Sequence, residues 1–270
     1  MAKKIMECLQ LGWKINDSFQ FDSFFGLVVE GRQRIGKSSY VSQALAEAEG
    51  RYEYDPVIRS VTQDYDAIKK WIVFRPKEFL DRVLSIKDKA KCLIWDDAGF
   101  WLFALDWYEA FVKTVARYIQ LCGRQFGCLI LTSPSQKMIS GKVLEALPDM
   151  LVCRIREEGM DSLRIRPREA RVFRRWDYPD GKKGGVRKLF VDHFNAISPD
   201  DYWRWYRPKS DEYMAIGLSI LKREVTKMTR KLDKGEVEDQ VHDVEKVVGD
   251  PDKLIELQEI IANLEKSKAP

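Results

Sequence analysis

Residues 31–38 read G-R-Q-R-I-G-K-S and directly follow an apolar run at residues 24–30. Glycines at the two ends of such a segment let the backbone bend closely around phosphate oxygens. Exposed N–H groups and the start of a helix then hold the anion. Lys37 would place a positive charge on the β and γ phosphates, and Ser38 would offer a hydroxyl to Mg²⁺. The segment predicts a site for Mg²⁺ and a nucleotide, with a chance match in a tight turn as the alternative.

This phosphate loop is unusual because it contains two arginines. The residues expected to line the nucleotide are Gly31, Arg32, Gln33, Arg34, Ile35, Gly36, Lys37, Ser38 and Ser39. A guanidinium group inside the loop can reach the γ phosphate and stabilise charge in the transition state. Arg34 is the candidate for this role within the chain, although arginines here can equally be solvated. Arg124, in G-R-Q-F at residues 123–126, is the candidate from a neighbouring subunit.

An apolar strand candidate at residues 92–95 ends in two acids. We expect Asp96 to hold Mg²⁺ through water and Asp97 to orient and polarise the attacking water. Thr132 and Ser133 end the next strand candidate, where either can sense the γ phosphate or this water. The alternatives are surface acids at a strand end and a strand-terminal turn. No N-K-x-D guanine signature is present, which favours ATP over GTP.

Strand and helix signals alternate along the first 156 residues. Strands are expected at residues 24–30, 57–61, 71–74, 92–95, 126–132 and 151–155, and helices at 37–48, 64–70, 76–86, 107–121 and 139–147. This alternation predicts an α/β fold, in which a parallel sheet carries helices on both faces. About 60 residues separate the phosphate loop from the acidic pair, with the strand at 71–74 between them. That order favours the additional-strand class of P-loop ATPases.

Basic residues are concentrated in the middle of the chain. Residues 151–190 hold twelve Lys or Arg against six Asp or Glu, and segments 163–166, 170–176 and 187–191 alternate like antiparallel strands. We expect a basic β-hairpin that binds nucleic acid through phosphate contacts, with a solvated sheet face as the alternative. The residues chosen for this contact are Arg171, Arg174, Arg175, Lys182, Lys183 and Arg187. The aromatic residues that follow, Trp203, Trp205 and Tyr206, belong either to a buried cluster or to a surface that stacks on bases.

The pattern divides the chain into a P-loop core (1–156), a basic β-rich extension (157–209) and a helical, acidic C-terminal region (210–270). Residues 232–270 hold eleven acidic against five basic residues, which suggests a separate protein partner. No window approaches the length of a membrane span, and the N-terminus does not read as a signal peptide. We therefore expect a cytoplasmic protein without a membrane partner.

Two segments resemble a known group of ATPases. L-I-W-D-D-A-G at residues 93–99 and C-L-I-L-T-S at 128–133 are similar to the acidic motif and first sensor of AAA+ replication initiators and helicase loaders. They also resemble ATPases carried by archaeal viruses and plasmids, and the arginine-bearing loop resembles that of viral DNA-packaging motors. The resemblance implies ATP and Mg²⁺ as cofactors, a homo-oligomer, and host cytoplasm as the location if the protein is viral. It gives Thr132 or Ser133 the sensor role.

The leading hypothesis from the sequence is a Mg²⁺-dependent ATPase that acts on DNA in replication, packaging or translocation of a mobile element. A second hypothesis is a binding protein whose assembly is switched by ATP, with slow hydrolysis. A small-molecule kinase is the third, disfavoured because no acceptor-binding motif or mobile lid signature is recognisable. Stimulation of hydrolysis by DNA would distinguish the first hypothesis from the second.

Overall fold

The computed structural model describes residues 8–50, 52–54, 59–61, 63–103, 109–147, 149–162, 164–176 and 185–233. The chain forms two compact units, Met1–Asp211 and Glu212–Pro270. The core and the basic extension expected as separate domains share the first unit. The division at residues 156 and 209 stays a prediction. None of the described helices is long and apolar enough to cross a membrane.

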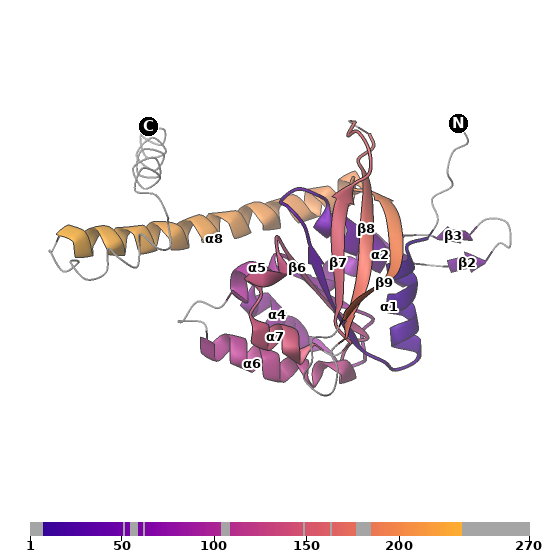
Figure 1. The fold of residues 1–270 in the computed structure, drawn as a ribbon, viewed down its shortest axis with the longest axis horizontal. Helices are drawn as coiled ribbons and strands as arrows, with labels where there is room; N and C mark the ends of the chain where they lie inside the picture. Colours follow the sequence, from indigo (N-terminus) through magenta and orange to yellow (C-terminus); the bar gives the residue numbers. More distant parts are fainter. Residues whose placement is uncertain are drawn as a thin grey trace. The chain divides into compact units, whose positions relative to one another are not determined.

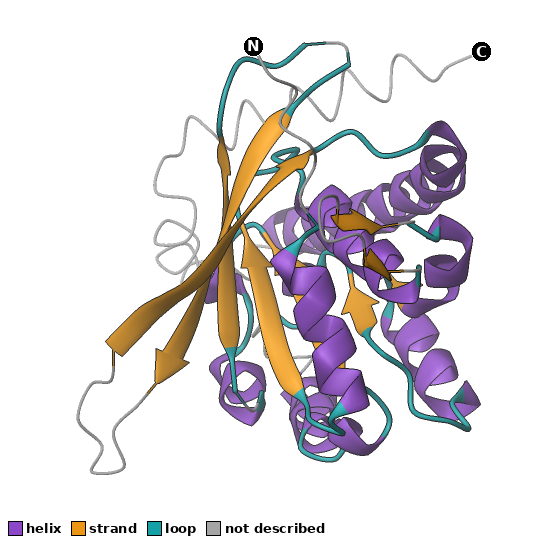
Figure 2. Ribbon diagram, turned by 90° about the vertical axis from the view of Figure 1, so that its right-hand side faces the viewer, coloured by secondary structure: helices purple, strands orange, loops and turns teal. Residues whose placement is uncertain are grey.

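A seven-stranded sheet forms the centre of the first unit, in the order β4-β5-β6-β1-β7-β8-β9 (Figure 2). Its strands are β1 (Phe25–Glu30), β4 (Ile72–Val73), β5 (Leu93–Trp95), β6 (Cys128–Ser133), β7 (Leu151–Glu157), β8 (Pro167–Trp176) and β9 (Gly185–Asn195). The first five in the sheet order are parallel, whereas β8 and β9 are antiparallel to their neighbours. Strand β6 lies between β1 and β5, so one strand separates the phosphate loop from the acidic pair.

Helices cover both faces of this sheet (Figure 1). The helices are α1 (Gln10–Gln20), α2 (Lys37–Glu49), α3 (Tyr65–Ile68), α4 (Pro76–Ser85), α5 (Ala98–Trp101), α6 (Glu109–Ile119), α7 (Gly141–Ala146) and α8 (Asp200–Asp233). Tyr40 of α2 packs against Phe194 of β9, and Phe79 of α4 stacks on Trp95 of β5. The α/β fold with helices on both faces of a largely parallel sheet is confirmed.

The central strands are largely apolar because both of their faces are covered. All six residues of β6 are buried, and so are the first five of β1. Helices on the two sides exclude water from both faces of a parallel sheet, which removes the polar–apolar alternation of half-exposed strands. Continuous apolar runs are therefore what the fold requires at these positions.

Some expected elements differ from the structure. Residues 57–61 were expected to be a strand of the main sheet, but β3 (Arg59–Val61) pairs with β2 (Tyr52–Tyr54) in a separate two-stranded sheet. The expected strand at 163–166 is also wrong, since strand structure begins only at Pro167. The pairing partner of a strand of three or four residues cannot be predicted from its alternating residue types, because the partner comes from a part of the chain that is distant in sequence.

Helix α8 begins ten residues before the helix expected from about residue 210. A proline ring within a helix removes one hydrogen bond and crowds the preceding turn. In the structure Pro208 lies inside α8. The aromatic residues ahead of it therefore belong to the first turns of α8. Residues 234–270 of the expected helical C-terminal region lie outside the described residues.

Candidate functional site

The phosphate loop joins β1 to α2 at the carboxyl edge of the parallel strands. Gly36 precedes α2 with φ 106°, a left-handed conformation that favours glycine. A Cβ at this position would lie 2.7 Å from Cβ of Ala196, so the site also lacks space for a side chain. Glycine is thus needed here for two independent reasons. The geometry brings the N-terminus of a thirteen-residue helix to the open side of the loop, as an anion site requires.

Lys37 is the first residue of α2, and its side chain curls back into the loop. Its Nζ donates hydrogen bonds to the carbonyls of Gly31, at 2.9 Å, and Arg32, at 3.1 Å. Burial lowers the pKa of Lys37, while the charges of Asp97 and Asp96 act to raise it. The ammonium group therefore lies inside the curve of the loop, where it can meet phosphate oxygens.

Asp96, at the end of β5, is the centre of a buried hydrogen-bond network. It is 1% exposed. Ser38 Oγ and Thr132 Oγ1 donate to Asp96 Oδ1 at 3.0 and 2.6 Å. Tyr206 OH donates to Asp96 Oδ2 at 2.6 Å. The two residues expected to serve Mg²⁺, Ser38 and Asp96, are thus in direct contact, although they lie on different elements.

Asp97 follows in a left-handed conformation, with φ 52° and ψ 33°. A non-glycine residue in this region is uncommon and is often found at functional sites. Burial, followed by the charge of Asp96, raises the pKa of Asp97 to about 6, and Lys37 opposes this shift. Asp97 can therefore give up its proton near neutral pH and take one back, as a general base must.

Thr132 connects the two acids. Its hydroxyl donates to Asp96 Oδ1 and accepts a 2.8 Å hydrogen bond from the backbone N–H of Asp97. Ser133, the other sensor candidate, donates instead to the carbonyl of Ser135 at 2.8 Å. Strand β6 lies next to β5 in the sheet, so its end is close to the two acids. Of the two candidates on this strand, Thr132 is the one that hydrogen-bonds to both acids.

The remaining residues of the phosphate loop differ in their exposure and in their contacts. Arg32, Gln33 and Arg34 are exposed, and Arg32 forms an ion pair with Glu157 of β7. Arg34 has φ 61°, again in the left-handed region. Ile35 is buried, and the hydroxyl of Ser39 donates to the carbonyl of Ala196 at 3.0 Å.

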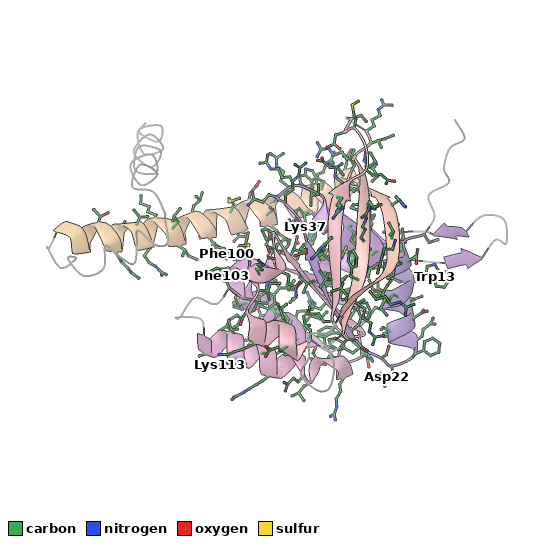
Figure 3. The ribbon with its side chains drawn as sticks, in the orientation of Figure 1. Trp13, Asp22, Lys37, Phe100, Phe103 and Lys113 are labelled. Carbon is green, nitrogen blue, oxygen red and sulfur yellow. The ribbon has the colours of Figure 1, made fainter. Side chains whose placement is uncertain are left out.

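Arg124 lies near the amino ends of the parallel strands, whereas the phosphate loop and the acidic pair lie at their carboxyl ends. It belongs to a 3-10 turn (Cys122–Arg124) before the start of β6, whereas Thr132 lies near the end of that strand. A six-residue strand spans about 20 Å. In Figure 3, Lys37, which follows β1, and Asp22, which precedes it, lie toward opposite ends of that strand. Arg124 is therefore too distant for its own phosphate loop, and its role in a neighbouring subunit stays a prediction.

The β8–β9 hairpin braces the phosphate loop. Arg168 of β8, with a side chain 3% exposed, donates from Nε to the carbonyl of Ile35 at 3.0 Å. Its two terminal nitrogens bind both oxygens of Asp161, at 2.6 and 2.8 Å. On β9, the carbonyl of Asn195 accepts from Gln43 of α2 at 2.6 Å. Sequence reasoning counted Arg168 among the basic surface residues, because a charged residue in an alternating strand is usually exposed.

The arginines chosen for nucleic-acid contact do not share one face. Arg171 is opposite Arg154 of β7, and Arg174 is opposite Arg187 of β9. Positions three apart on a strand point to opposite faces, so Arg171 and Arg174 are separated by the sheet. Arg171 pairs with Glu169, and Arg174 pairs with Asp149. The side chain of Arg175 and the whole of Lys182 and Lys183 lie outside the described residues.

No family model matches the chain, but individual known proteins are similar to it. The chain is 26% identical over 202 residues to the uncharacterized protein B-251 of Sulfolobus spindle-shape virus 1. The matched region covers 72% of this chain and 69% of that protein. Among solved structures, it is similar to the flagellar accessory protein FlaH from Methanocaldococcus jannaschii, at 12% identity and a TM-score of 0.30. That match covers 72% of this chain and 97% of the FlaH chain.

Proposed function

We propose that this protein binds ATP with Mg²⁺ and hydrolyses it in the service of a nucleic acid. The observation that carries the proposal is the meeting of Lys37, Ser38, Asp96 and Asp97 at one edge of the sheet. Two hydrogen bonds on one carboxylate oxygen, from Ser38 and Thr132, join the helix after β1 to the ends of β5 and β6. Such a set of an ammonium, a hydroxyl and two carboxylates beside a helix N-terminus suits a metal-bound triphosphate.

Each side chain has a defined part in the hydrolysis. The loop N–H groups and the Lys37 ammonium would bind the β and γ phosphates. Ser38 and Asp96 would hold Mg²⁺, which when bound neutralises charge on these phosphates. Asp97 would take a proton from water as the water oxygen attacks the γ phosphorus. The bond from that phosphorus to the bridging oxygen breaks at the same time, leaving ADP and inorganic phosphate. Thr132 would orient both acids.

The metal fits this donor set. Asp96 supplies a carboxylate and Ser38 a hydroxyl, and oxygen ligands of this kind, with water completing the shell, are those that Mg²⁺ prefers. Both oxygens lie in a partly buried polar network, which holds their positions before the metal arrives. Preorganised oxygen ligands lower the cost of assembling a metal site.

The nucleic-acid part of the proposal rests on the outward face of β7 and β8. Arg154 and Arg156 of β7 share this face with Arg171, the Cα partner of Arg154. The guanidinium carbon of Arg154 lies 5.8 Å from the ring centroid of Phe173, which leaves an aromatic ring beside the basic groups. Arg154 already pairs with Glu30 at 2.7 Å, so phosphate binding here involves an exchange of partners.

Replacing Lys37 by alanine tests the nucleotide site. We expect the Lys37→Ala variant to lose ATP binding in calorimetry and to lose phosphate release, because the loop would lose the ammonium that meets the phosphates. Lys77→Ala is the matched control, since Lys77 lies on α4 in an exposed ion pair with Asp81. Normal ATP turnover by Lys37→Ala would refute the proposed hydrolysis site.

Replacing Arg154, Arg156 and Arg171 together by alanine tests the nucleic-acid face. Binding of labelled single- and double-stranded DNA is measured by fluorescence anisotropy over a series of salt concentrations. Each lost phosphate contact on duplex DNA reduces the slope of log affinity against log salt by about 0.9, so we expect a change of up to about 3. A control variant removes three exposed lysines at other positions, Lys77, Lys87 and Lys113. Equal slopes in the two variants would contradict the assignment of this face.

The ATPase rate with and without DNA then separates the proposed enzyme from a slow switch. We expect DNA to raise the rate of the wild type but not of the arginine triple variant. ATP-dependent assembly, with slow hydrolysis that DNA leaves unchanged, would favour the nucleotide-controlled switch instead.

A further inference from the structure

A tyrosine hydroxyl lies between the two proposed metal-binding residues. Tyr206 OH is 2.6 Å from Asp96 Oδ2 and 3.1 Å from Ser38 Oγ. The side chain comes from the second turn of α8, more than 100 residues from either partner in the sequence, and it is 8% exposed. The contact is therefore a tertiary feature, and it brings α8 directly into the nucleotide site.

The position of this hydroxyl conflicts with a metal and its shell. Mg²⁺ binds oxygens at about 2.0–2.1 Å in near-ideal octahedral geometry and retains several waters. An oxygen within hydrogen-bond distance of both Ser38 Oγ and Asp96 Oδ2 occupies space that the ion or one of its waters needs.

Several contacts hold the start of α8 against the core in this state. The hydroxyls of Tyr202 and Ser42 lie 2.6 Å apart. The ring of Phe74 meets Tyr206 edge-on, with centroids 5.4 Å apart. Within α8 itself, Trp203 stacks on Tyr206 at 5.7 Å, with 19° between the rings. The phenol is thus one end of an aromatic cluster, and its displacement would disturb the packing of the first turns of α8.

We propose that Tyr206 occupies the metal position in the nucleotide-free protein and leaves it when Mg²⁺ and ATP bind, so that the start of α8 responds to the nucleotide. This inference rests on the proposed function of the same site. Tyr206 acts as a competitor of the metal, and its departure gives the protein a way to transmit nucleotide binding to α8. The stacking of Trp203 on Tyr206 extends the change toward the protein surface, since Trp203 is 48% exposed.

Replacing Tyr206 by phenylalanine tests the competition, since it keeps the ring and removes the hydroxyl. ATP binding is measured by calorimetry at graded concentrations of free Mg²⁺. We expect the Mg²⁺ concentration for half-maximal enhancement of ATP binding to fall about tenfold, in line with the loss of one hydrogen bond to a charged group. Tyr118→Phe is the matched control, because this hydroxyl lies on α6 and contacts Gln125, outside both α8 and the proposed metal site. An unchanged or raised Mg²⁺ requirement in Tyr206→Phe would overturn the competition.

Hydrogen exchange of the first turns of α8 gives a second readout that does not depend on turnover. In the wild type, we expect ATP with Mg²⁺ to speed amide exchange in residues 203–210 relative to ATP with EDTA. In Tyr206→Phe, this exchange should already be fast without nucleotide. Exchange in these residues that slows with Mg²⁺ and ATP, as in the rest of the protein, would refute the displacement of α8.

The two proposals fail in different ways. If the wild type binds no ATP at any Mg²⁺ concentration, the proposed function is wrong and the role of Tyr206 falls with it. If the wild type binds Mg²⁺ and ATP, and Tyr206→Phe has the same Mg²⁺ requirement as the wild type, only the role of Tyr206 is wrong.

Discussion

The Asp97→Asn variant tests the proposed base through both stability and catalysis. Asparagine keeps the size of the side chain but cannot carry the charge that burial and Asp96 oppose. Because the pKa of Asp97 is raised from 3.8 to about 6 on folding, the folded protein binds more protons than the unfolded chain between these two pH values. The free energy of unfolding of the wild type therefore falls as pH rises from about 4 to about 6.

The size of this effect follows from the pKa values. A difference between 3.8 and about 6 corresponds to about 3 kcal/mol of unfolding free energy at neutral pH. The neutral asparagine side chain would be free of this penalty. We therefore expect the stability of Asp97→Asn relative to the wild type to rise by up to about 3 kcal/mol between pH 4 and pH 7. The titrating groups that do not interact with Asp97 are shared by the two proteins and cancel in the difference.

The assay is denaturant unfolding in EDTA at half-unit steps of pH, followed by ATP binding and turnover at pH 7.5. Loss of a general base lowers turnover by about 10²–10⁴-fold. ATP binding should remain, since Lys37 and Ser38 are unchanged. Asp88→Asn, at an exposed position, is the control for removal of a carboxylate outside the site.

Two results would refute this reasoning. A stability difference between Asp97→Asn and the wild type that is constant from pH 4 to 7 would show that the charge of Asp97 does not destabilise the folded protein. Loss of ATP binding in a folded variant would show that Asp97 serves the ligand and not the attacking water.

Two further predictions concern helix α2, which follows the phosphate loop, and the hairpin that braces the loop. Burial raises the pKa of Glu47 to about 7, so the wild type loses stability as pH rises from 4.5 toward 7. Glu47→Gln, which keeps an acceptor for the N–H of Leu9, should flatten this part of the pH profile of unfolding, and an unaltered profile would contradict the assignment. Arg168→Lys cannot bind Asp161 with two nitrogens and also reach Ile35, so we expect a loss of about 1–3 kcal/mol in denaturant unfolding and weaker ATP binding in calorimetry. Unchanged ATP affinity would show that this arginine supports the hairpin alone.

The local features of the site were predictable from the sequence. The glycines, Lys37 and Ser38 lie within eight residues, and their spacing alone specifies a loop between a strand and a helix. The acidic pair was recognisable for a similar reason, because an apolar run that ends in two carboxylates marks the end of a buried strand. Order along the chain also predicted the parallel sheet, since alternating strands and helices pack with few topologies.

The contacts that the β8–β9 hairpin and α8 make with the candidate site could not be predicted from the sequence. Basic residues in alternating strands predicted one charged surface, but Arg168 points inward to Ile35 because the sheet has two faces and one of them packs on the loop. Tyr206 carried no signal that distinguished it from an ordinary core aromatic.

The sequence by itself thus determined the residue types of the candidate site: the loop, its lysine and hydroxyl, and the acids at the end of β5. Only the tertiary structure decided which of two adjacent hydroxyls joins the acids, how the hairpin supports the loop, and which helix closes over the metal position. The physical reason is one of range. Motifs record interactions between near neighbours in the chain, whereas Tyr206 meets Ser38 and Asp96 across 168 and 110 residues, through packing that no local pattern encodes.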